Sequence, residues 1–272
     1  MNDQTINDLT VTLLQQNLLW EDAPANLRNF EAALESSEQK TTSPEVILLP
    51  EMFTTGFTMN TSLSETMTGP TVQWLRDLSG KYKALVMGSL IVKEGGKIHN
   101  RLVAVRENET FTYDKAHLFP LGGENLAYSR GSNLTTIIHN GWKIRPYICY
   151  DLRFPLWMRN FPDTTGEAAY DVAVVVANWP ASRTMQWQSL LIARAIENQS
   201  YIIGLNRVGT DGNGIAYCGD SLVIDPTGTV VAHLGDGEAV GHTTLSASLL
   251  EETRRNYPFL RDGDSHLVKG DA

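Results

Sequence analysis

One stretch of the chain runs Ile144-Arg145-Pro146-Tyr147-Ile148-Cys149-Tyr150-Asp151-Leu152-Arg153-Phe154-Pro155. It begins as an apolar strand and becomes charged shortly after Cys149. Pro155 suits the first turn of a helix, because a fixed φ and a missing N–H cost little there. A strand that stops abruptly before a helix holds one side chain outward beside backbone N–H groups, which is the geometry of a nucleophile elbow. The stretch therefore leaves two interpretations of Cys149 open, a nucleophile or a small buried hydrophobe.

Composition restricts the class of protein. The chain has 272 residues, of which 42% are hydrophobic and 19% charged, as in an ordinary globular domain. Its formal net charge of −9 argues against nucleic-acid and anionic-membrane partners. With 2 cysteines there is no disulfide framework, and the N-terminal sequence lacks the pattern of a signal peptide. No apolar run approaches the roughly 18 residues of a membrane span. We therefore expect a cytoplasmic protein without a nucleic-acid or membrane partner.

Hydrophobic periodicity predicts interleaved strands and helices. Strands are expected at 9–14, 46–49, 85–92, 102–105, 111–113, 134–139, 142–148, 172–177, 201–205, 221–224 and 230–232, and helices at 24–38, 71–83 and 184–199. Several of these strands are apolar throughout, as expected when both faces of a sheet are covered. The order indicates an α/β protein with helices packed on its sheets, and hairpins among the crossovers indicate mixed sheets. No linker or internal repeat is visible, which favours a single domain.

Three more residues stand where chemistry is often found, each with an ordinary alternative. Glu51 follows an apolar strand, and α/β folds place their sites at such strand ends; the alternative is a solvated loop glutamate. Lys115 ends the strand 111–114, and the alternative is a surface lysine with a buried stem. Glu124 lies in the Gly-rich loop 121–125 and says little by itself. None of the three identifies a site alone.

The remaining chemical motifs are weak or absent. No histidine stands at metal-ligand spacing from another His or Cys. His117 is an alternative base for Cys149. There is no phosphate-binding loop and no dinucleotide fingerprint, and 211–214 is interpreted as a turn instead of a calcium loop. Cys218 is interpreted as a structural strand cysteine. The sequence therefore predicts neither a metal nor a cofactor.

Three fragments in a fixed order carry a resemblance to a known family. They are Leu49-Pro50-Glu51-Met52-Phe53-Thr54-Thr55-Gly56-Phe57, Tyr113-Asp114-Lys115-Ala116-His117-Leu118-Phe119 and Cys149-Tyr150-Asp151-Leu152-Arg153-Phe154-Pro155. Together they closely resemble the nitrilase superfamily of carbon–nitrogen hydrolases. The match continues through 177–180, 193–198, 206–209 and 219–221. With Ala-Asn-Trp-Pro at 177–180, the chain is most similar to the Nit and ω-amidase branch, and within it to bacterial proteins.

The resemblance implies a fold, an assembly and a catalytic set. The fold would be a four-layer α-β-β-α sandwich with two mixed sheets, formed by a single domain over 8–250 and followed by a tail over 251–272. The chain would pair into a homodimer. Carried over by position, the catalytic residues are Glu51, Lys115 and Cys149, with Glu124 as a further glutamate.

The roles of these residues follow from the needs of amide hydrolysis. Cys149 attacks the carbonyl, and Glu51 takes the thiol proton, passes it to the leaving amine and then activates water. Lys115 and the backbone N–H of Tyr150 stabilise the oxyanion. Glu124 holds Lys115 or the substrate amide, and its negative charge also favours the charged form of the lysine.

The same resemblance implies a small-molecule substrate, the ω-amide of a 2-oxo dicarboxylic acid monoamide such as 2-oxoglutaramate or 2-oxosuccinamate, which yields the acid and ammonia. Its far carboxylate needs a cation, and Arg153 and Arg183 are the candidates. The other predicted substrate-binding residues are Tyr150, Asn178, Trp179, Tyr128 and Phe57. An aromatic residue at such a position can equally belong to the core.

Other functions stay open. The chain can be another amide hydrolase of the superfamily, acting on an N-carbamoyl compound or an aliphatic amide, or a true nitrilase. It can also be a non-catalytic interaction protein that keeps the fold. The complete set of Glu51, Lys115, Cys149 and Glu124 argues against the last alternative, because a binding scaffold has no physical need for all four.

Overall fold

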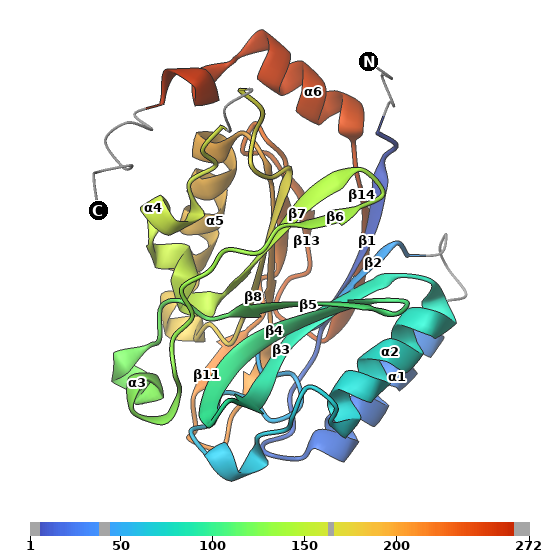
Figure 1. Cartoon of the computed structure of the whole chain (residues 1–272), viewed down its shortest axis with the longest axis vertical. Helices are drawn as coiled ribbons and strands as arrows, with labels where there is room; N and C mark the ends of the chain where they lie inside the picture. The colour runs from blue at the N-terminus through green and yellow to red at the C-terminus, as the bar shows by residue number, and fades with distance from the viewer. Residues whose placement is uncertain (1–5, 38–43, 163–165, 264–272) are drawn as a thin grey trace.

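The computed structural model describes residues 6–37, 44–162 and 166–263. Two six-stranded sheets form its centre (Figure 1). The first sheet has the order β14 (Ala239–Leu245), β1 (Leu9–Gln15), β2 (Val46–Leu48), β3 (Leu85–Glu94), β4 (Lys97–Arg106), β5 (Glu109–Asp114). The second has the order β13 (Val230–His233), β12 (Leu222–Ile224), β9 (Tyr201–Asn206), β8 (Val172–Ala177), β7 (Trp142–Ile148), β6 (Ile137–His139). Both sheets are mixed, with parallel pairs at their centres and antiparallel pairs at their edges.

Helices cover the outer faces of the two sheets. α1 (Ala23–Ser37) and α2 (Pro70–Tyr82) pack on the first sheet, and α5 (Thr184–Asn198) packs on the second, with the short α4 (Pro155–Met158) on the same side of the molecule (Figure 1). The remaining helices are α3 (Glu124–Ala127) and α6 (Ala247–Asn256). The predicted four-layer α-β-β-α arrangement is therefore confirmed.

Strand β2 shows why several strands are apolar throughout. Successive side chains of a strand point to opposite faces of the sheet. Val46 and Leu48 join the core between the two sheets, while Ile47 joins the core under α1 and α2. On the second sheet α5 approaches closely at Gly204, where a Cβ would lie 2.4 Å from a methyl carbon of Leu191. Both faces of each sheet are thus buried.

The structure confirms each strand and each long helix expected from the sequence, and it adds elements that the pattern missed. The turn at Asn140-Gly141 has the two positive φ angles of a tight hairpin turn, 49° and 85°. Strand β14 was missed because it is an edge strand with partly exposed residues and no apolar alternation. Helix α6 was missed as well, although Ser246 caps it by accepting a hydrogen bond from the N–H of Leu249. The short pair β10 (Val208–Thr210) and β11 (Ala216–Cys218) was also not expected.

Three expectations fall partly outside the described residues. These are the N-terminal sequence, residue 38 at the end of the first predicted helix, and positions 264–272 of the predicted tail. The predicted boundary after residue 250 falls inside α6. Within the described ranges, no helix is both long enough and apolar enough to cross a membrane.

Candidate active site

The backbone at Cys149 forms the predicted elbow. Cys149 follows β7 directly, begins a 3₁₀ helix (Cys149–Arg153), and has a φ of 44°. A residue with a side chain costs about 1–2 kcal/mol in this left-handed region. Such strain persists only where the surroundings fix it, and it is concentrated at functional sites. Pro155 begins α4, as expected.

Asp151 is the residue that fixes this elbow. Its fully buried carboxylate accepts hydrogen bonds from the backbone N–H of Ile148 at 3.1 Å and the hydroxyl of Tyr113 at 2.7 Å. It also accepts from the backbone N–H of His117 at 3.0 Å and from its Nδ1 at 2.8 Å. Asp151 therefore ties the nucleophile's turn to the loop that follows Lys115.

The ring of His117, the alternative base, is held by two neighbouring residues. Its ring stacks on Phe154 with centroids 3.7 Å apart, and its Nδ1 is occupied by Asp151. No hydrogen bond joins it to Cys149 among the described residues. His117 thus supports the elbow through Asp151 and Phe154.

Lys115 sits between the two predicted glutamates. Its Nζ lies 2.8 Å from Oε1 of Glu51 and 2.9 Å from Oε2 of Glu124, and all three side chains are fully buried. Glu51 follows β2, Lys115 follows β5, and Glu124 begins α3. The N–H of Phe119 donates to Glu124 at 2.6 Å. The fold therefore brings Glu51 to a lysine and a glutamate that lie at least 64 residues further along the chain.

Asn100 completes this cluster and was missed by the sequence reasoning. Its Nδ2 donates to Glu51 at 2.8 Å and to Glu124 at 3.0 Å, and its Oδ1 accepts from the hydroxyl of Ser89 at 2.8 Å. Asn100 lies in β4 and Ser89 lies in β3, and both side chains are buried. Ser89 is a polar residue within an otherwise apolar stretch, and this signal could have found it because buried polar groups need partners. Asn100 lies among polar neighbours, so the sequence around it carries no such signal.

The electrostatics of the cluster explain the protonation states. Burial lowers the pKa of Lys115, but the charges of Glu124 and Glu51 outweigh it and raise the pKa, so the lysine stays charged. Burial raises the pKa of Glu124, which Lys115 offsets only in part. Burial and then Glu51 raise the pKa of the Cys149 thiol well above its usual range. The thiol is therefore protonated at rest and needs a base for its attack.

Asn178 connects Glu51 to the nucleophile. Its backbone N–H donates to Oε2 of Glu51 at 2.8 Å, and its Nδ2 donates to the backbone carbonyl of Glu51 at 2.7 Å. Sγ of Cys149 lies 3.9 Å from the carbonyl oxygen of Asn178. The residue that follows β8 thus contacts both the carboxylate of Glu51 and the thiol of Cys149.

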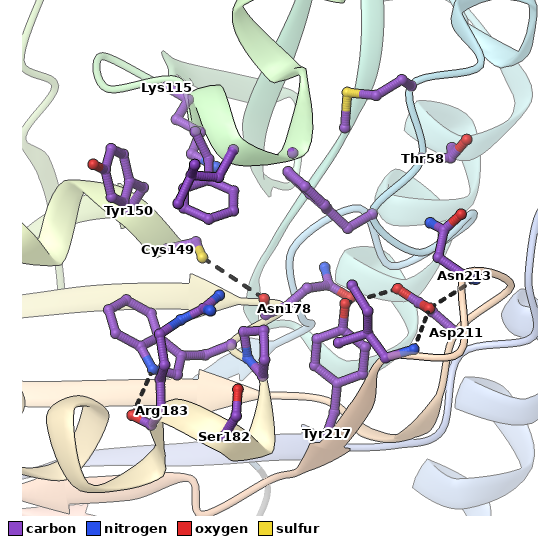
Figure 2. A pocket seen from close by; sticks show the side chains of 18 of the residues that line it. Thr58, Lys115, Cys149, Tyr150, Asn178, Ser182, Arg183, Asp211, Asn213 and Tyr217 are labelled. Carbon is purple, nitrogen blue, oxygen red and sulfur yellow. Dashed lines mark hydrogen bonds between the residues drawn. The ribbon is translucent and has the colours of Figure 1, made fainter.

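A cavity of about 700 Å³ opens above these residues (Figure 2). We call Lys115, Cys149 and the buried Glu51, Glu124 and Asn100 the floor. The arginine wall consists of Phe119, Tyr150, Arg153, Trp179 and Arg183, and the hairpin wall consists of Trp20, Thr58, Asp211, Asn213, Ile215 and Tyr217. The hairpin wall is built largely by the loop between β10 and β11, where the predicted turn at 211–214 is present; its place in the cavity was not expected.

The predicted substrate-binding residues divide into two groups. Most of them line the cavity, namely Phe57, Tyr150, Arg153, Asn178, Trp179 and Arg183. Tyr128 does not: it is buried behind the wall, where its hydroxyl donates to the backbone carbonyl of Thr58. It packs with Met52 and Ile91, so its role in the structure is to support the loop that carries Thr58.

Both arginines rest on aromatic rings. The guanidinium of Arg153 lies 4.6 Å from the ring centroid of Trp179 and donates to Oε1 of Gln186 at 2.6 Å. The guanidinium of Arg183 lies 5.5 Å from the ring of Phe119. Among the described residues no carboxylate forms an ion pair with either arginine. Two planar cations without an acid partner suit a carboxylate ligand.

The described part of the chain holds no group of three or more His, Cys, Asp or Glu residues suited to a metal ion. A cysteine on a strained turn beside a buried carboxylate and a buried lysine is the set of groups that a cysteine hydrolase needs to act on a carbonyl or a related carbon.

Comparison with known proteins identifies the family. A sequence model described as Carbon-nitrogen hydrolase matches residues 10–255, and the chain belongs to this family. It is 44% identical over 258 residues to Omega-amidase YafV of Escherichia coli K12, covering 94% of this chain and 97% of that protein. It is 33% identical over 258 residues to the 2-oxoglutaramate amidase of Bacillus subtilis 168, covering 93% and 96%.

A solved structure agrees with this assignment. The chain superposes on XC1258 from Xanthomonas campestris, described as a CN-hydrolase superfamily protein with an arsenic adduct in the active site, with a TM-score of 0.91. The two are 39% identical, and the match covers 95% of this chain and 98% of the other. The predicted membership of the nitrilase superfamily, in its ω-amidase branch, is confirmed.

Proposed function

We propose that the chain is an ω-amidase, which hydrolyses the ω-amide of 2-oxo dicarboxylic acid monoamides such as 2-oxoglutaramate and 2-oxosuccinamate to the acid and ammonia. One observation carries the proposal. The Cys149 thiol and the buried Glu51–Lys115 pair lie in the floor of a cavity whose wall presents two arginines that have no acid partner among the described residues. The relatives named Omega-amidase and 2-oxoglutaramate amidase support the same substrate class.

The first half of the reaction forms a thioester. Glu51 accepts the Cys149 proton as the sulfur attacks the amide carbon, since the raised pKa of the thiol makes spontaneous ionisation unfavourable. The oxyanion that develops is stabilised by Lys115 and by the backbone N–H of Tyr150, which follows the nucleophile. Glu51 then gives the proton to the leaving nitrogen, the C–N bond breaks, and ammonia departs.

The second half hydrolyses the thioester. Glu51, now ionised again, removes a proton from water, which attacks the thioester carbon and releases the acid and the thiol. Glu124 and Asn100 keep Lys115 and Glu51 in place through both halves, because each contacts two members of the cluster. Lys115 needs no proton transfer and acts as a fixed charge.

The arginine wall supplies the substrate's second anchor. A dicarboxylic acid monoamide carries a carboxylate at the end opposite the amide, and this carboxylate can accept paired hydrogen bonds from a guanidinium. Arg153 and Arg183 come from the turns after β7 and β8, so both stand above the nucleophile. Trp179 holds them in relation to each other, because its ring lies under Arg153 and its indole N–H donates to the carbonyl of Arg183 at 2.9 Å.

Ammonia release tests the proposal. Purified protein receives 2-oxoglutaramate, an N-carbamoyl amino acid, an aliphatic amide and a nitrile in parallel. We expect ammonia from 2-oxoglutaramate, abolished by Cys149→Ala and retained by Cys218→Ala, the matched variant of the other cysteine. No ammonia from 2-oxoglutaramate would refute the substrate class. Full activity of Cys149→Ala would refute the mechanism.

We further propose that the chain works in the cytoplasm as a homodimer with one catalytic domain over 8–250. The free state of both cysteines fits a reducing compartment. Met185 and Ile196 on α5 and Leu156 on α4 are exposed apolar side chains of the kind that a partner subunit covers. Light scattering after size-exclusion chromatography tests the dimer, and Ile196→Asp is expected to shift it toward the monomer.

A further inference from the structure

The cavity is larger than the proposed substrate requires. A volume of about 700 Å³ falls in the range that encloses drug-sized ligands. A five-carbon monoamide that reaches from Cys149 to the arginine wall fills only part of this space. The rest lies against the hairpin wall, so its lining defines a second lobe of the cavity.

The two lobes are separated by Asn178. Figure 2 shows Tyr150 and Arg183 near Cys149 in the left part of the view, and Asp211, Asn213 and Tyr217 beyond Asn178. If the acyl chain extends to the arginines, the nitrogen of the scissile amide faces the opposite direction. The second lobe therefore lies where a substituent on that nitrogen would project.

Glu51 is connected to the second lobe through the chain and through Asn178. The chain leaves Glu51, makes one turn, and lines this lobe with Thr58. Asn178, whose backbone N–H donates to Oε2 of Glu51 at 2.8 Å, also lines the cavity.

The lining of this lobe contains one carboxylate, that of Asp211, and otherwise neutral side chains. Both oxygens of the Asp211 carboxylate are occupied, by the backbone N–H groups of Asn213 and Ile215 at 2.8 and 3.0 Å and by the hydroxyl of Tyr217 at 2.9 Å. The indole of Trp20 lies directly under the loop, because a Cβ on Gly212 would come within 2.5 Å of its nitrogen. Aromatic and aliphatic groups with a few polar atoms suit an uncharged, partly apolar ligand.

We propose that the enzyme also hydrolyses secondary ω-amides, in which the amide nitrogen carries a neutral alkyl or arylalkyl group that occupies the second lobe. The inference rests on the proposed function and extends its substrate class from ammonia to larger leaving amines. The chemistry is unchanged. The Cys149 sulfur forms the C–S bond, the C–N bond breaks, and the amine leaves with the proton from Glu51; water then cleaves the thioester to the acid.

The test compares 2-oxoglutaramate with N-benzyl-2-oxoglutaramate, following ammonia and benzylamine. We expect wild-type protein to release both amines. Ile215→Trp places a larger side chain in the second lobe on a partly exposed loop position. It should lower the kcat/KM for the benzyl substrate relative to the primary amide by about tenfold, as expected for a filled apolar pocket. Asn213→Trp, at an exposed position of the same loop, is the second variant if the first is unstable.

Ile138→Trp is the matched control, because Ile138 is an exposed residue of β6 that does not line the cavity. This variant should keep the wild-type ratio. Release of ammonia without benzylamine would overturn the inference while leaving the proposed function intact. An unchanged ratio in both loop variants would also overturn it. Release of neither amine would overturn the proposed function itself, and the inference with it.

Discussion

In the floor of the cavity each charged side chain is held by several short hydrogen bonds, whereas the two arginines of the wall rest on aromatic rings. Lys115 contacts two carboxylates, and Asn100 contacts the same two. Arg153 has one hydrogen bond to a neutral amide. The floor is thus fixed before substrate arrives, while the wall keeps free hydrogen-bonding capacity for a ligand. We infer that the floor determines which reaction occurs and that the arginine wall determines which substrate is bound.

Glu51→Gln is expected to give the largest effect. Glutamine keeps the shape of the side chain but cannot accept the thiol proton, so kcat should fall by about 10²–10⁴. Because Glu51 also raises the pKa of Cys149, the thiol should titrate at lower pH in the variant. Steady-state ammonia release and the ultraviolet absorbance of the thiolate measure the two effects.

In Glu51→Gln the thiol of Cys149 should thus ionise more easily, and yet the enzyme should be slower. An exposed glutamate on α6 provides the control, and Glu252→Gln should change neither. If Glu51→Gln retained activity within a few fold, the floor would not contain the base, and the distinction between floor and wall would fail.

Asp151→Asn is expected to give the next largest effect. The variant keeps one carbonyl oxygen, so it loses part of the hydrogen bonding that fixes the positive φ of Cys149. Hydrogen bonds to a charged group contribute about 1.5–3 kcal/mol each, and kcat should fall about tenfold or more while KM changes little. Initial rates at several substrate concentrations separate the two constants.

Asp171→Asn is the matched control, since Asp171 is a buried aspartate at the far end of β8 that bonds Lys143 and Arg254. It should lower the melting temperature without lowering kcat. Equal losses of kcat in both variants would show that Asp151 acts only through overall stability.

Arg183→Met and Arg153→Met should affect KM more than kcat. Each removes one cation from the arginine wall without touching the floor, and loss of a charge-assisted hydrogen bond to the substrate's carboxylate weakens binding about 10- to 100-fold. The larger increase in KM identifies the arginine that holds the carboxylate directly. An aliphatic amide without a carboxylate is the control substrate, and its KM should be insensitive to both changes. A fall in kcat with unchanged KM would place the arginines in the chemical step.

The floor was largely predictable from the sequence and the walls were not, for a physical reason. Glu51, Lys115 and Cys149 each follow a strand, and strands are visible as apolar runs, so the end of each run marks its position. The strand ends alone did not assign these residues to one site, and the family resemblance did so for them and for Glu124. Asn100 lies just before the predicted strand 102–105, in a polar stretch that was not expected to be part of it. The hairpin wall depends on how the loop between β10 and β11 folds over Trp20, and no periodicity encodes that contact.

The fold shows the same division. Central strands buried on both faces were found, whereas β14 was missed because most of its residues are only partly buried. The partner of β14 is β1, at the opposite end of the chain, and the pairing of Leu9 with Leu245 depends on a contact between distant residues. A local sequence pattern reveals a strand when one face or both faces of the strand are buried. It does not reveal a strand whose position is determined only by pairing with a distant strand.

The smallest expected effect concerns Glu124 and the dependence of stability on pH. Burial raises the pKa of this carboxyl above its ordinary value of 4.5. Between the pKa of the unfolded state and that of the folded state, the folded state binds more protons. The stability that this group contributes is therefore complete below about pH 4.5 and is lost as pH rises through the folded pKa.

Glu124→Gln removes this loss of stability. The melting temperature of the variant should therefore gain on that of wild type as pH rises from 4.5, while Glu252→Gln should keep a constant difference. Calorimetry over a series of buffers measures the trend, and a difference that moves the other way would mean that Lys115 dominates the charge of Glu124, making the floor a simple ion pair.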